Sequence, residues 1–418
     1  MSLSLRCSRL RIPTRFARAA AVALVAIGSF ACLSSGAFAA TRTWTGSASG
    51  TAARQWGTST AAAANWSSAT NPSSVDTGVF SSSINQSVTA VSGNTLPIGS
   101  LVFRGSGTTN FSMNTGASIV IYGNAGSPNV GISSTSGRQN FSGLGRVVVN
   151  ASQMTFISSA GGLNFFGGGL DLNGNYLKAQ GNIVQGNLGS SVSGATYEVV
   201  SGNQALTFDS VTGVNVSNVV LNGGTATGDG TSSTDLTVNG GTWKEGGTFD
   251  AVTSSSGLVD LTGAAFLSTN SYFQSATGTT RGDVLTDLTS SLVYGNFELG
   301  GAYQLNASEL SSSLFPIGTM WSLFSGVNYK NGSPAAPNDA SNFSSFALTA
   351  DSSTSPYYGT FTNSGQEWSS PSASDGSYLV FQAATGNLVV VPEPSTCVMA
   401  LAGLACGGYS MFRRRRVR

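Results

Sequence analysis

The sequence predicts an all-β fold, in which a right-handed parallel β-helix or solenoid is followed by an antiparallel β-sandwich-like domain. Short runs of Val, Ile, Leu and Phe alternate with clusters of Gly, Asn, Ser and Thr, as strands alternate with turns. No long stretch shows helical periodicity. Charged residues make up 9% of the 418 residues and hydrophobic residues 40%, a balance that supports a packed core and argues against disorder.

Residues 1–39 have the pattern of a helical signal peptide. Five arginines precede an apolar stretch at residues 19–33. Small residues follow, and Ala37 and Ala39 form the A-x-A pattern at which signal peptidase cleaves. We therefore expect an exported protein whose mature chain begins near Ala40. A retained membrane anchor is the alternative, which the shortness of the apolar stretch disfavours.

Residues 40–100 contain tryptophans that we interpret as an N-terminal cap. Trp44, Trp56 and Trp66, followed by a Leu-Val-Phe run at residues 101–103, resemble the opening of bacterial proteins with autotransporter-associated β-strand repeats. The resemblance extends to residue 245 and implies a body of repeated strands. Terminal repeats of a solenoid must close its open apolar end, and tryptophans suit that task. An aromatic platform for sugar rings is the alternative.

Residues 101–282 are predicted to form the β-helix. Asn-Gly-Gly triplets recur beside short apolar runs, at residues 222–224 and 239–241. Such residues suit the corners at which stacked strands turn, and a low charge suits layers that cover one another's edges. A β-sandwich with Asn-Gly hairpins is the competing fold.

Residues 283–391 are predicted to form a separate C-terminal β domain. The apolar runs there are longer and more aromatic, as at residues 378–381 and 388–391. Several of them alternate apolar and polar residues with a period of two, which is typical of half-buried antiparallel strands.

The last part of the chain, residues 392–418, consists of three segments in a fixed order. An apolar run at residues 397–412 separates a Pro-Glu-Pro motif from a cluster of arginines. The motif with its neighbours comprises Val391, Pro392, Glu393, Pro394 and Ser395. The cluster comprises Arg413, Arg414, Arg415 and Arg416.

These three segments resemble the PEP-CTERM sorting tail. The resemblance implies a transmembrane helix that holds the exported protein transiently in the inner membrane, with the arginines on the cytoplasmic side. It also implies an exosortase-type transpeptidase as a partner, which removes the tail before the protein reaches the cell surface or the extracellular matrix. A permanent tail anchor is the alternative.

The composition excludes several kinds of chemistry and of partner. The chain has no His, and its four Cys lie in the two terminal segments, which excludes His-based triads and zinc or haem ligation from the body. We expect no catalytic residue, no metal and no cofactor. Each terminal segment holds five of the 19 basic residues and the tail holds one of the 18 acidic residues, so the body keeps nine basic and 17 acidic residues and a net charge of −8. An acidic body argues against a nucleic-acid partner.

Carboxylates are the remaining candidates for chemistry. Asp209, Asp235 and Asp260 are separated by 26 and 25 residues, a spacing that fits successive layers of a β-helix. Further candidates are Asp229, Lys244, Glu245 and Asp250. We favour the interpretation that all of them are solvated corner residues.

We therefore expect an exported, non-catalytic cell-surface or extracellular-matrix protein that is associated with exopolysaccharide or with adhesion. The alternative is a polysaccharide-degrading lyase or hydrolase on the same β-helix.

Overall fold

A computed structural model gives the fold of the chain. It describes residues 39–46, 54–81, 85–124, 128–208, 215–263, 265–310, 314–334, 343–365 and 367–393, together with residues 402, 404 and 405. The chain divides into two units, Met1–Ala40 and Thr41–Arg418. The first unit contributes only Ala39 and Ala40 to the described residues, so the predicted helical signal segment, apart from Ala39, lies outside them.

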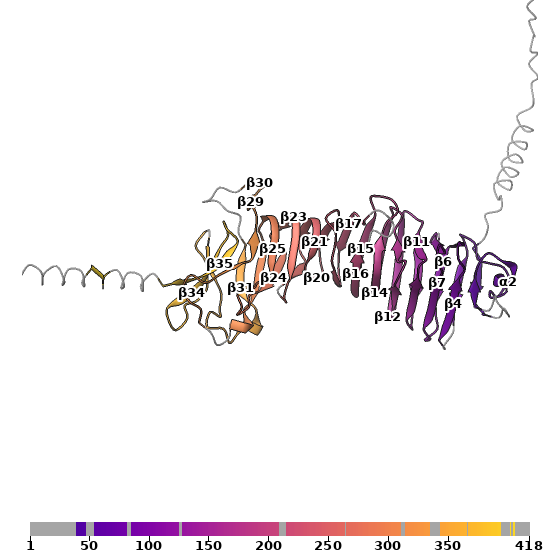
Figure 1. Ribbon diagram of the computed structural model, residues 1–418, viewed down its shortest axis with the longest axis horizontal. Helices are drawn as coiled ribbons and strands as arrows, with labels where there is room; N and C mark the ends of the chain where they lie inside the picture. The colour runs from indigo at the N-terminus through magenta and orange to yellow at the C-terminus, as the bar shows by residue number, and fades with distance from the viewer. Residues whose placement is uncertain are drawn as a thin grey trace, which may run out of the picture. The chain divides into compact units, whose positions relative to one another are not determined.

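The second unit is all-β and contains one large parallel sheet, which is compatible with the predicted solenoid. The parallel strands form three ladders, and the chain visits the three ladders one after the other before it returns to the first. Most strands pair with the strand of the same ladder in the next round of the chain. We call one such round a layer. Figure 1 shows the strands of successive layers side by side, from the indigo to the orange part of the chain.

Ladder A runs through twelve strands. They are β1 (Thr41–Thr43), β3 (Thr77–Phe80), β6 (Ser100–Phe103), β9 (Val130–Ser134), β12 (Gln153–Phe165), β14 (Tyr176–Gly189), β15 (Thr196–Ser201), β17 (Asn218–Leu221), β19 (Asp235–Val238), β21 (Gly247–Ser254), β23 (Phe266–Gln274) and β25 (Leu292–Glu298).

In each layer, the chain enters ladder B directly after ladder A. Ladder B includes the second part of β12 and the middle of β14. Its other strands are β2 (Gln55–Trp56), β4 (Gln86–Ala90), β7 (Thr109–Met113), β10 (Gln139–Gly143), β16 (Asn203–Phe208), β18 (Thr225–Gly228), β20 (Thr242–Lys244), β22 (Leu258–Asp260), β24 (Thr279–Asp283), β26 (Ala302–Asn306) and β31 (Ser345–Leu348).

Ladder C is shorter and ends in β14 and β16. Its other strands are β5 (Thr95–Ile98), β8 (Ser118–Ile121), β11 (Arg146–Val149) and β13 (Leu170–Asp171). In later layers the first parts of β21, β23 and β25 form the corresponding ladder and continue to β28 (Phe324–Ser325).

The core lies inside the ladders because alternate residues of each strand point inward. In β7, buried and exposed residues alternate, and Phe111 is one of the buried ones. Phe141 and Phe165 occupy the same register position in the next two layers. The three rings stack almost parallel, with centroid distances of 4.6 and 4.9 Å. This aromatic stack, together with the ladder hydrogen bonds, stabilises each layer against its neighbours.

The predicted tryptophan cap is part of this core. The short helix α2 (Thr60–Ala63) begins after Ser59, whose Oγ accepts the backbone N–H of Ala62. Trp66 contacts Trp44 and Trp56 edge-on, at centroid distances of 5.2 and 5.3 Å. All three rings are buried in the first layers, as capping requires. They therefore have no open face for a sugar ring.

A five-stranded antiparallel sheet follows the last layers. Its order is β27 (Met320–Ser322), β35 (Asn387–Pro392), β34 (Ser377–Gln382), β33 (Glu367–Ser369) and β32 (Thr362–Asn363). The remaining short elements are the hairpin β29 (Tyr329–Lys330) and β30 (Ser333–Pro334), and the 3₁₀ helices η3 (Ser308–Leu310) and η4 (Ala350–Ser352).

The parallel sheet extends beyond the predicted β-helix range of residues 101–282 at both ends. β1 already pairs in parallel with β3, and β26 pairs in parallel with β31. Residue 283 is therefore not a boundary of the sheet, and only the antiparallel sheet resembles the C-terminal domain predicted at residues 283–391. The alternation in this region could not reveal the difference, because a parallel strand with one exposed face has the same period of two.

Candidate functional site

The predicted sorting motif begins inside the last strand. Val391 and Pro392 belong to β35, where they pair with Tyr378 and Ser377 of β34. The backbone N–H of Glu393 then donates to the carbonyl of Gly376, at 2.6 Å. Proline has no N–H to donate to a ladder, so it is tolerated here, at the terminus of the strand, where the ladder ends. The last strand therefore ends one residue beyond the predicted boundary at residue 391, and the backbone hydrogen bonding reaches Glu393, two residues beyond it.

The other predicted tail and signal residues lie mostly outside the described part of the chain. Ala39 is described as an exposed residue ahead of β1. The remaining ones, Ala37, Pro394, Ser395, Arg413, Arg414, Arg415 and Arg416, are not among the described residues. No described helix combines the length and the apolar content that a membrane crossing requires.

The spacing of the candidate carboxylates does not bring Asp235 and Asp260 together, and Asp260 is buried, unlike the solvated corner residue that we expected. Asp235 lies in ladder A, where it is in register with Asn218, whereas Asp260 lies in ladder B. Asp209 lies outside the described residues. The spacing of 25 residues between Asp235 and Asp260 does not match the layer length here. Trp243 pairs with Val259, so one layer is only 16 residues long.

The other predicted charged candidates are also separate from one another. Asp250 accepts a hydrogen bond from Asn270 Nδ2 at 2.7 Å. Lys244 is exposed and in register with Asp260. Glu245 follows it with a positive φ of 74°, which marks a turn. Among the residues that the structure describes, no three or more Cys, Asp or Glu side chains are grouped to hold a metal ion.

Aspartates at strand ends form a recurring feature that the sequence analysis missed. Asp171, Asp260 and Asp283 are the last residues of β13, β22 and β24, and all three are buried. Each carboxylate accepts a backbone N–H from a turn, and for Asp171 and Asp260 the donor lies two residues further on. The local signal is an Asp-x-Asn or Asp-x-Thr pattern directly after an apolar run.

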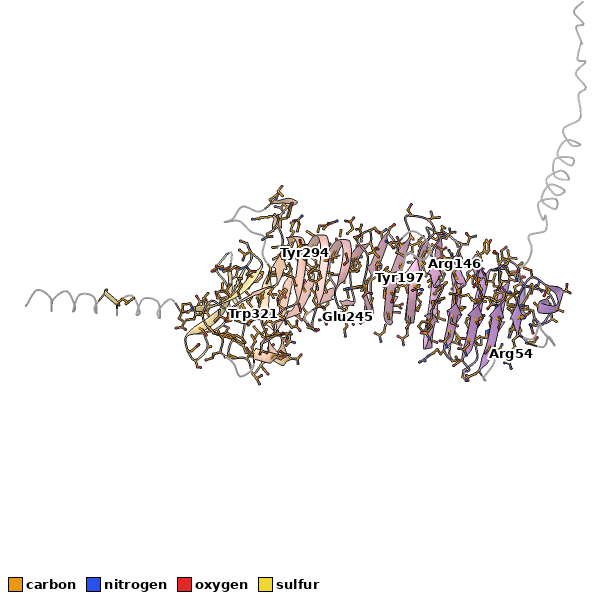
Figure 2. All side chains as sticks on the ribbon, viewed as in Figure 1. Arg54, Arg146, Tyr197, Glu245, Tyr294 and Trp321 are labelled. Atoms are coloured by element: carbon orange, nitrogen blue, oxygen red, sulfur yellow. The ribbon has the colours of Figure 1, made fainter. Side chains whose placement is uncertain are left out.

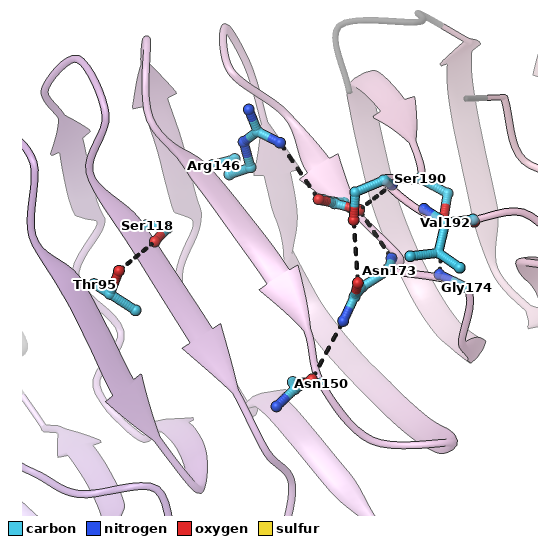
Figure 3. Close-up of polar contacts among 10 residues, drawn as sticks. Thr95, Ser118, Arg146, Asn150, Asn173, Gly174, Ser190 and Val192 are labelled. Carbon is cyan, nitrogen blue, oxygen red and sulfur yellow. Dashed lines mark hydrogen bonds and ion pairs between the residues drawn. The ribbon is translucent and has the colours of Figure 1, made fainter. Parts of the chain in front are cut away.

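The Asp171 carboxylate belongs to a network that joins several layers. Its Oδ1 accepts the N–H groups of Asn173 and Ser191, both at 2.8 Å, and its Oδ2 lies 3.4 Å from Arg146 Nη1. Asn173 Nδ2 in turn donates to Asn150 Oδ1 at 3.2 Å (Figure 3). With these partners the carboxylate fixes turns between layers.

Glu198 is the centre of a second network, on the outer side of ladder A. Its Oε2 accepts from Tyr176 Oη at 2.6 Å, and its Oε1 accepts from Asn222 Nδ2 at 2.7 Å. Lys178 Nζ lies 3.4 Å from the same carboxylate. Burial alone would raise the pKa of Glu198, but the two hydrogen bonds and the ammonium group hold it below its ordinary value. Burial and the carboxylate raise the pKa of the Tyr176 hydroxyl.

A polar groove of about 500 Å³ lies over the last layers of ladder B. Arg281, Gln304 and Ala347 share one register position in β24, β26 and β31, and the small Ala347 leaves room beside Gln304. Arg281 donates from Nε and Nη2 to Gln304 Oε1, at 3.0 and 2.6 Å. Its Nη1 lies 3.6 Å from Asp260 Oδ2. The groove can therefore offer hydrogen bonds to a hydroxylated ligand, while its guanidinium group is already neutralised.

A second hollow, of about 290 Å³, combines aromatic and polar residues near β23 and β25. Its lining consists of Ser271, Tyr272, Phe273, Asn296, Phe297, Glu298, Tyr329 and Gly332. Both hollows join residues from several layers, so no local sequence motif indicates them.

Comparison of the chain with family models, with curated proteins and with solved structures gave no match.

Proposed function

We propose that this chain is an exported, non-catalytic cell-surface or extracellular-matrix protein that associates with exopolysaccharide or mediates adhesion. Signal peptidase and an exosortase-type transpeptidase would process its ends, and its layers would wind as a right-handed β-helix. One observation carries the proposal: the last strand of the body ends inside the Pro-Glu-Pro motif, at Pro392. Such an end leaves the whole body on one side of the motif and the apolar, arginine-ended tail on the other.

The engagement of the buried carboxylates supports a non-catalytic role. Asp76, Asp171, Glu198, Asp260 and Asp283 are the acidic residues that are buried in the described part of the chain. Each accepts hydrogen bonds from turns or from neighbouring side chains. Catalytic pairs of carboxylates need one group that is free to exchange a proton, and these five groups are committed to the fold.

The outer faces of the layers support contact with a hydroxylated polymer. Asn140 Nδ2 donates to Asn110 Oδ1, and Asn164 Nδ2 donates to Asn140 Oδ1, both at 2.7 Å. Asn164 is buried, whereas Asn110 is exposed and Asn140 half-buried, and the amides of these two still have donor or acceptor capacity for an outside partner. A neutral row of this kind, on a body with a net charge of −8, favours sugars over nucleic acid or anionic lipid.

The test is intact-mass analysis of the secreted protein and of the membrane fraction. We expect the secreted form to begin near Ala40 and to end within a few residues of Pro392. A variant that stops at Glu393 serves as the control, because it keeps the whole sheet and lacks the tail, and we expect it to be exported without a membrane-bound stage. A protein that keeps its arginines and stays in the membrane would contradict sorting and support a permanent anchor.

The non-catalytic part of the proposal has its own check. The mature body is incubated with a panel of acidic polysaccharides, and we expect no release of reducing or unsaturated ends. Release that Asp235→Asn abolishes, in a variant that melts at the wild-type temperature, would support the lyase or hydrolase instead. The melting control is needed because Asp235 Oδ1 accepts the backbone N–H of Ala251 at 3.2 Å.

A further inference from the structure

Four aromatic side chains lie in two pairs on the outer side of the last layers. Phe266 and Phe273 lie on β23, Tyr294 on β25 and Tyr329 on β29. Phe266, Phe273 and Tyr294 are 50, 42 and 55% exposed. We call these four residues the aromatic patch; Figure 2 labels Tyr294. Exposed aromatic groups are costly to keep in water, and a cluster of them marks a binding surface more often than a lone one does.

The rings of Phe266 and Tyr294 form a pair with open surroundings. Their centroids are 6.2 Å apart and the planes are inclined by 31°. Tyr294 is in register with Ser268 of the preceding layer and Ser325 of the following one. Small hydroxylated neighbours on both sides leave the ring uncovered and add hydrogen-bonding groups beside it.

The remaining two aromatic residues line the 290 Å³ hollow. Phe273 and Tyr329 line it together with the polar side chains of Ser271 and Asn296. Asn296 follows Tyr294 by two residues on β25, so the ring pair lies on the ladder formed by the first part of this strand and the hollow lies where the strand continues into ladder A.

The carboxylate in the hollow already accepts hydrogen bonds from the protein itself. Glu298 is the charged residue in its lining, and its carboxylate accepts the backbone N–H groups of Asn331 and Gly332, at 2.8 and 3.2 Å. No Lys or Arg is among the lining residues. An acidic polymer would therefore find no cation in the hollow and would be repelled by the net charge of −8 of the body.

We propose that the aromatic patch binds a neutral polysaccharide. The apolar faces of its sugar rings pack on Phe266 and Tyr294, and its hydroxyl groups bond to the Ser and Asn side chains between the aromatic residues. This assignment rests on the proposed association with exopolysaccharide and names the surface and the ligand class. It differs from the groove around Arg281, whose lining has no aromatic residue.

The test is isothermal titration of the mature protein with neutral hexasaccharides, cellohexaose and laminarihexaose, and with hexagalacturonate as the acidic comparison. We expect binding of at least one neutral hexasaccharide and none of hexagalacturonate. The double variant Phe266→Ala/Tyr294→Ala should bind about tenfold more weakly or worse, and Tyr294→Phe should bind like the wild type because it keeps the ring.

The matched control is Tyr122→Ala/Phe166→Ala, which removes two rings of similar exposure, 38 and 43%, from earlier layers. We expect this control to bind normally, and thermal unfolding shows that each variant is folded. Undiminished binding by Phe266→Ala/Tyr294→Ala would overturn the assignment, as would binding of hexagalacturonate alone. Self-association that the double variant abolishes, without any saccharide binding, would show that a second copy of the chain covers the patch. The proposed sorting is tested by the intact masses of the secreted and membrane-bound forms. None of the binding results depends on those masses, so the two proposals are tested independently.

Discussion

Glu198 shows how a single outward-facing acid ties layers together. Its partners come from the preceding layer, through Tyr176 and Lys178, and from the following one, through Asn222 directly after β17. Asn222 continues the connection, because its Oδ1 accepts from Asn239 Nδ2 at 3.1 Å. Hydrogen bonds to an ionised group are stronger than neutral ones, so this acid contributes more to stability while it is charged.

We predict that Glu198→Gln flattens the acid side of the pH–stability profile. The folded-state pKa of Glu198 lies below its ordinary value of 4.5, so its contribution is complete above that value and is lost as the pH falls through the folded-state pKa. At pH 7 the variant should lose about 1–3 kcal/mol in its free energy of unfolding. Between pH 6 and pH 3 it should lose less further stability than the wild type.

Urea unfolding at several pH values measures this effect. Glu367→Gln is the control, because Glu367 is exposed on β33, and it should follow the wild-type profile. Parallel profiles for wild type and Glu198→Gln would show that the carboxylate contributes nothing through its charge.

The sequence predicts the role of some residues from their type, but it does not predict which residues they contact. The sequence pattern predicts that Trp44, Trp56 and Trp66 cap the solenoid, and the three rings are buried. The Asp235–Asp260 spacing failed, because layer length varies and a residue's ladder depends on every turn before it. Tyr176 and Asn222 meet Glu198 only through the layer register, which no local pattern encodes.

At the scale of the elements, glycines at the corner between ladders A and B form a column through the layers. A side chain on Gly202 would overlap the backbone of Gly181, and one on Gly224 or Gly241 would overlap the carbonyl of the glycine beneath it. The Asn-Gly-Gly triplets at residues 222–224 and 239–241 therefore stand on successive layers. Their recurrence in the sequence correctly indicated stacked corners.

We predict that Gly181→Ala is much more harmful than Gly194→Ala. Both residues have a positive φ, of 87° and 88°, so either substitution strains the backbone by about 1–2 kcal/mol. A methyl group on Gly181 would also overlap the carbonyl oxygen of Ser158 in the layer beneath, whereas nothing lies within 4 Å of one on Gly194. Overpacking should add about 1–3 kcal/mol for Gly181→Ala alone.

Chemical unfolding of the two variants separates strain from contact. Equal losses of stability would mean that the layers shift freely and that close stacking of the corners does not limit this position. Because the φ values match, any difference between the variants reports the contact between layers.

At the scale of the whole second unit, the parallel layers and the antiparallel sheet share one aromatic core. Phe346 of β31 stacks on Tyr303 of β26 at 5.0 Å and on Phe381 of β34 at 5.1 Å. Phe381 also contacts Phe324 of β28 at 6.2 Å. The sequence indicated a change of texture near residue 283, but shared burial of this kind depends on contacts between distant segments. The periodicity of apolar residues therefore cannot reveal where the parallel layers end and the antiparallel sheet begins.

This shared core leads to a prediction about truncation. A mature chain that stops at Leu348 keeps the parallel layers but loses β32 to β35, and it exposes Tyr303, Phe324 and Phe346 together with the unprotected side of β31. Exposed aromatic groups beside an open strand edge promote association, so we expect soluble aggregates and a lower melting temperature. A chain that stops at Glu393 keeps every strand and should remain monomeric with the melting temperature of the mature body. Light scattering after gel filtration distinguishes the two chains. A monomeric, fully stable chain ending at Leu348 would show that the parallel layers close their own end, and that the antiparallel sheet serves a purpose other than covering them.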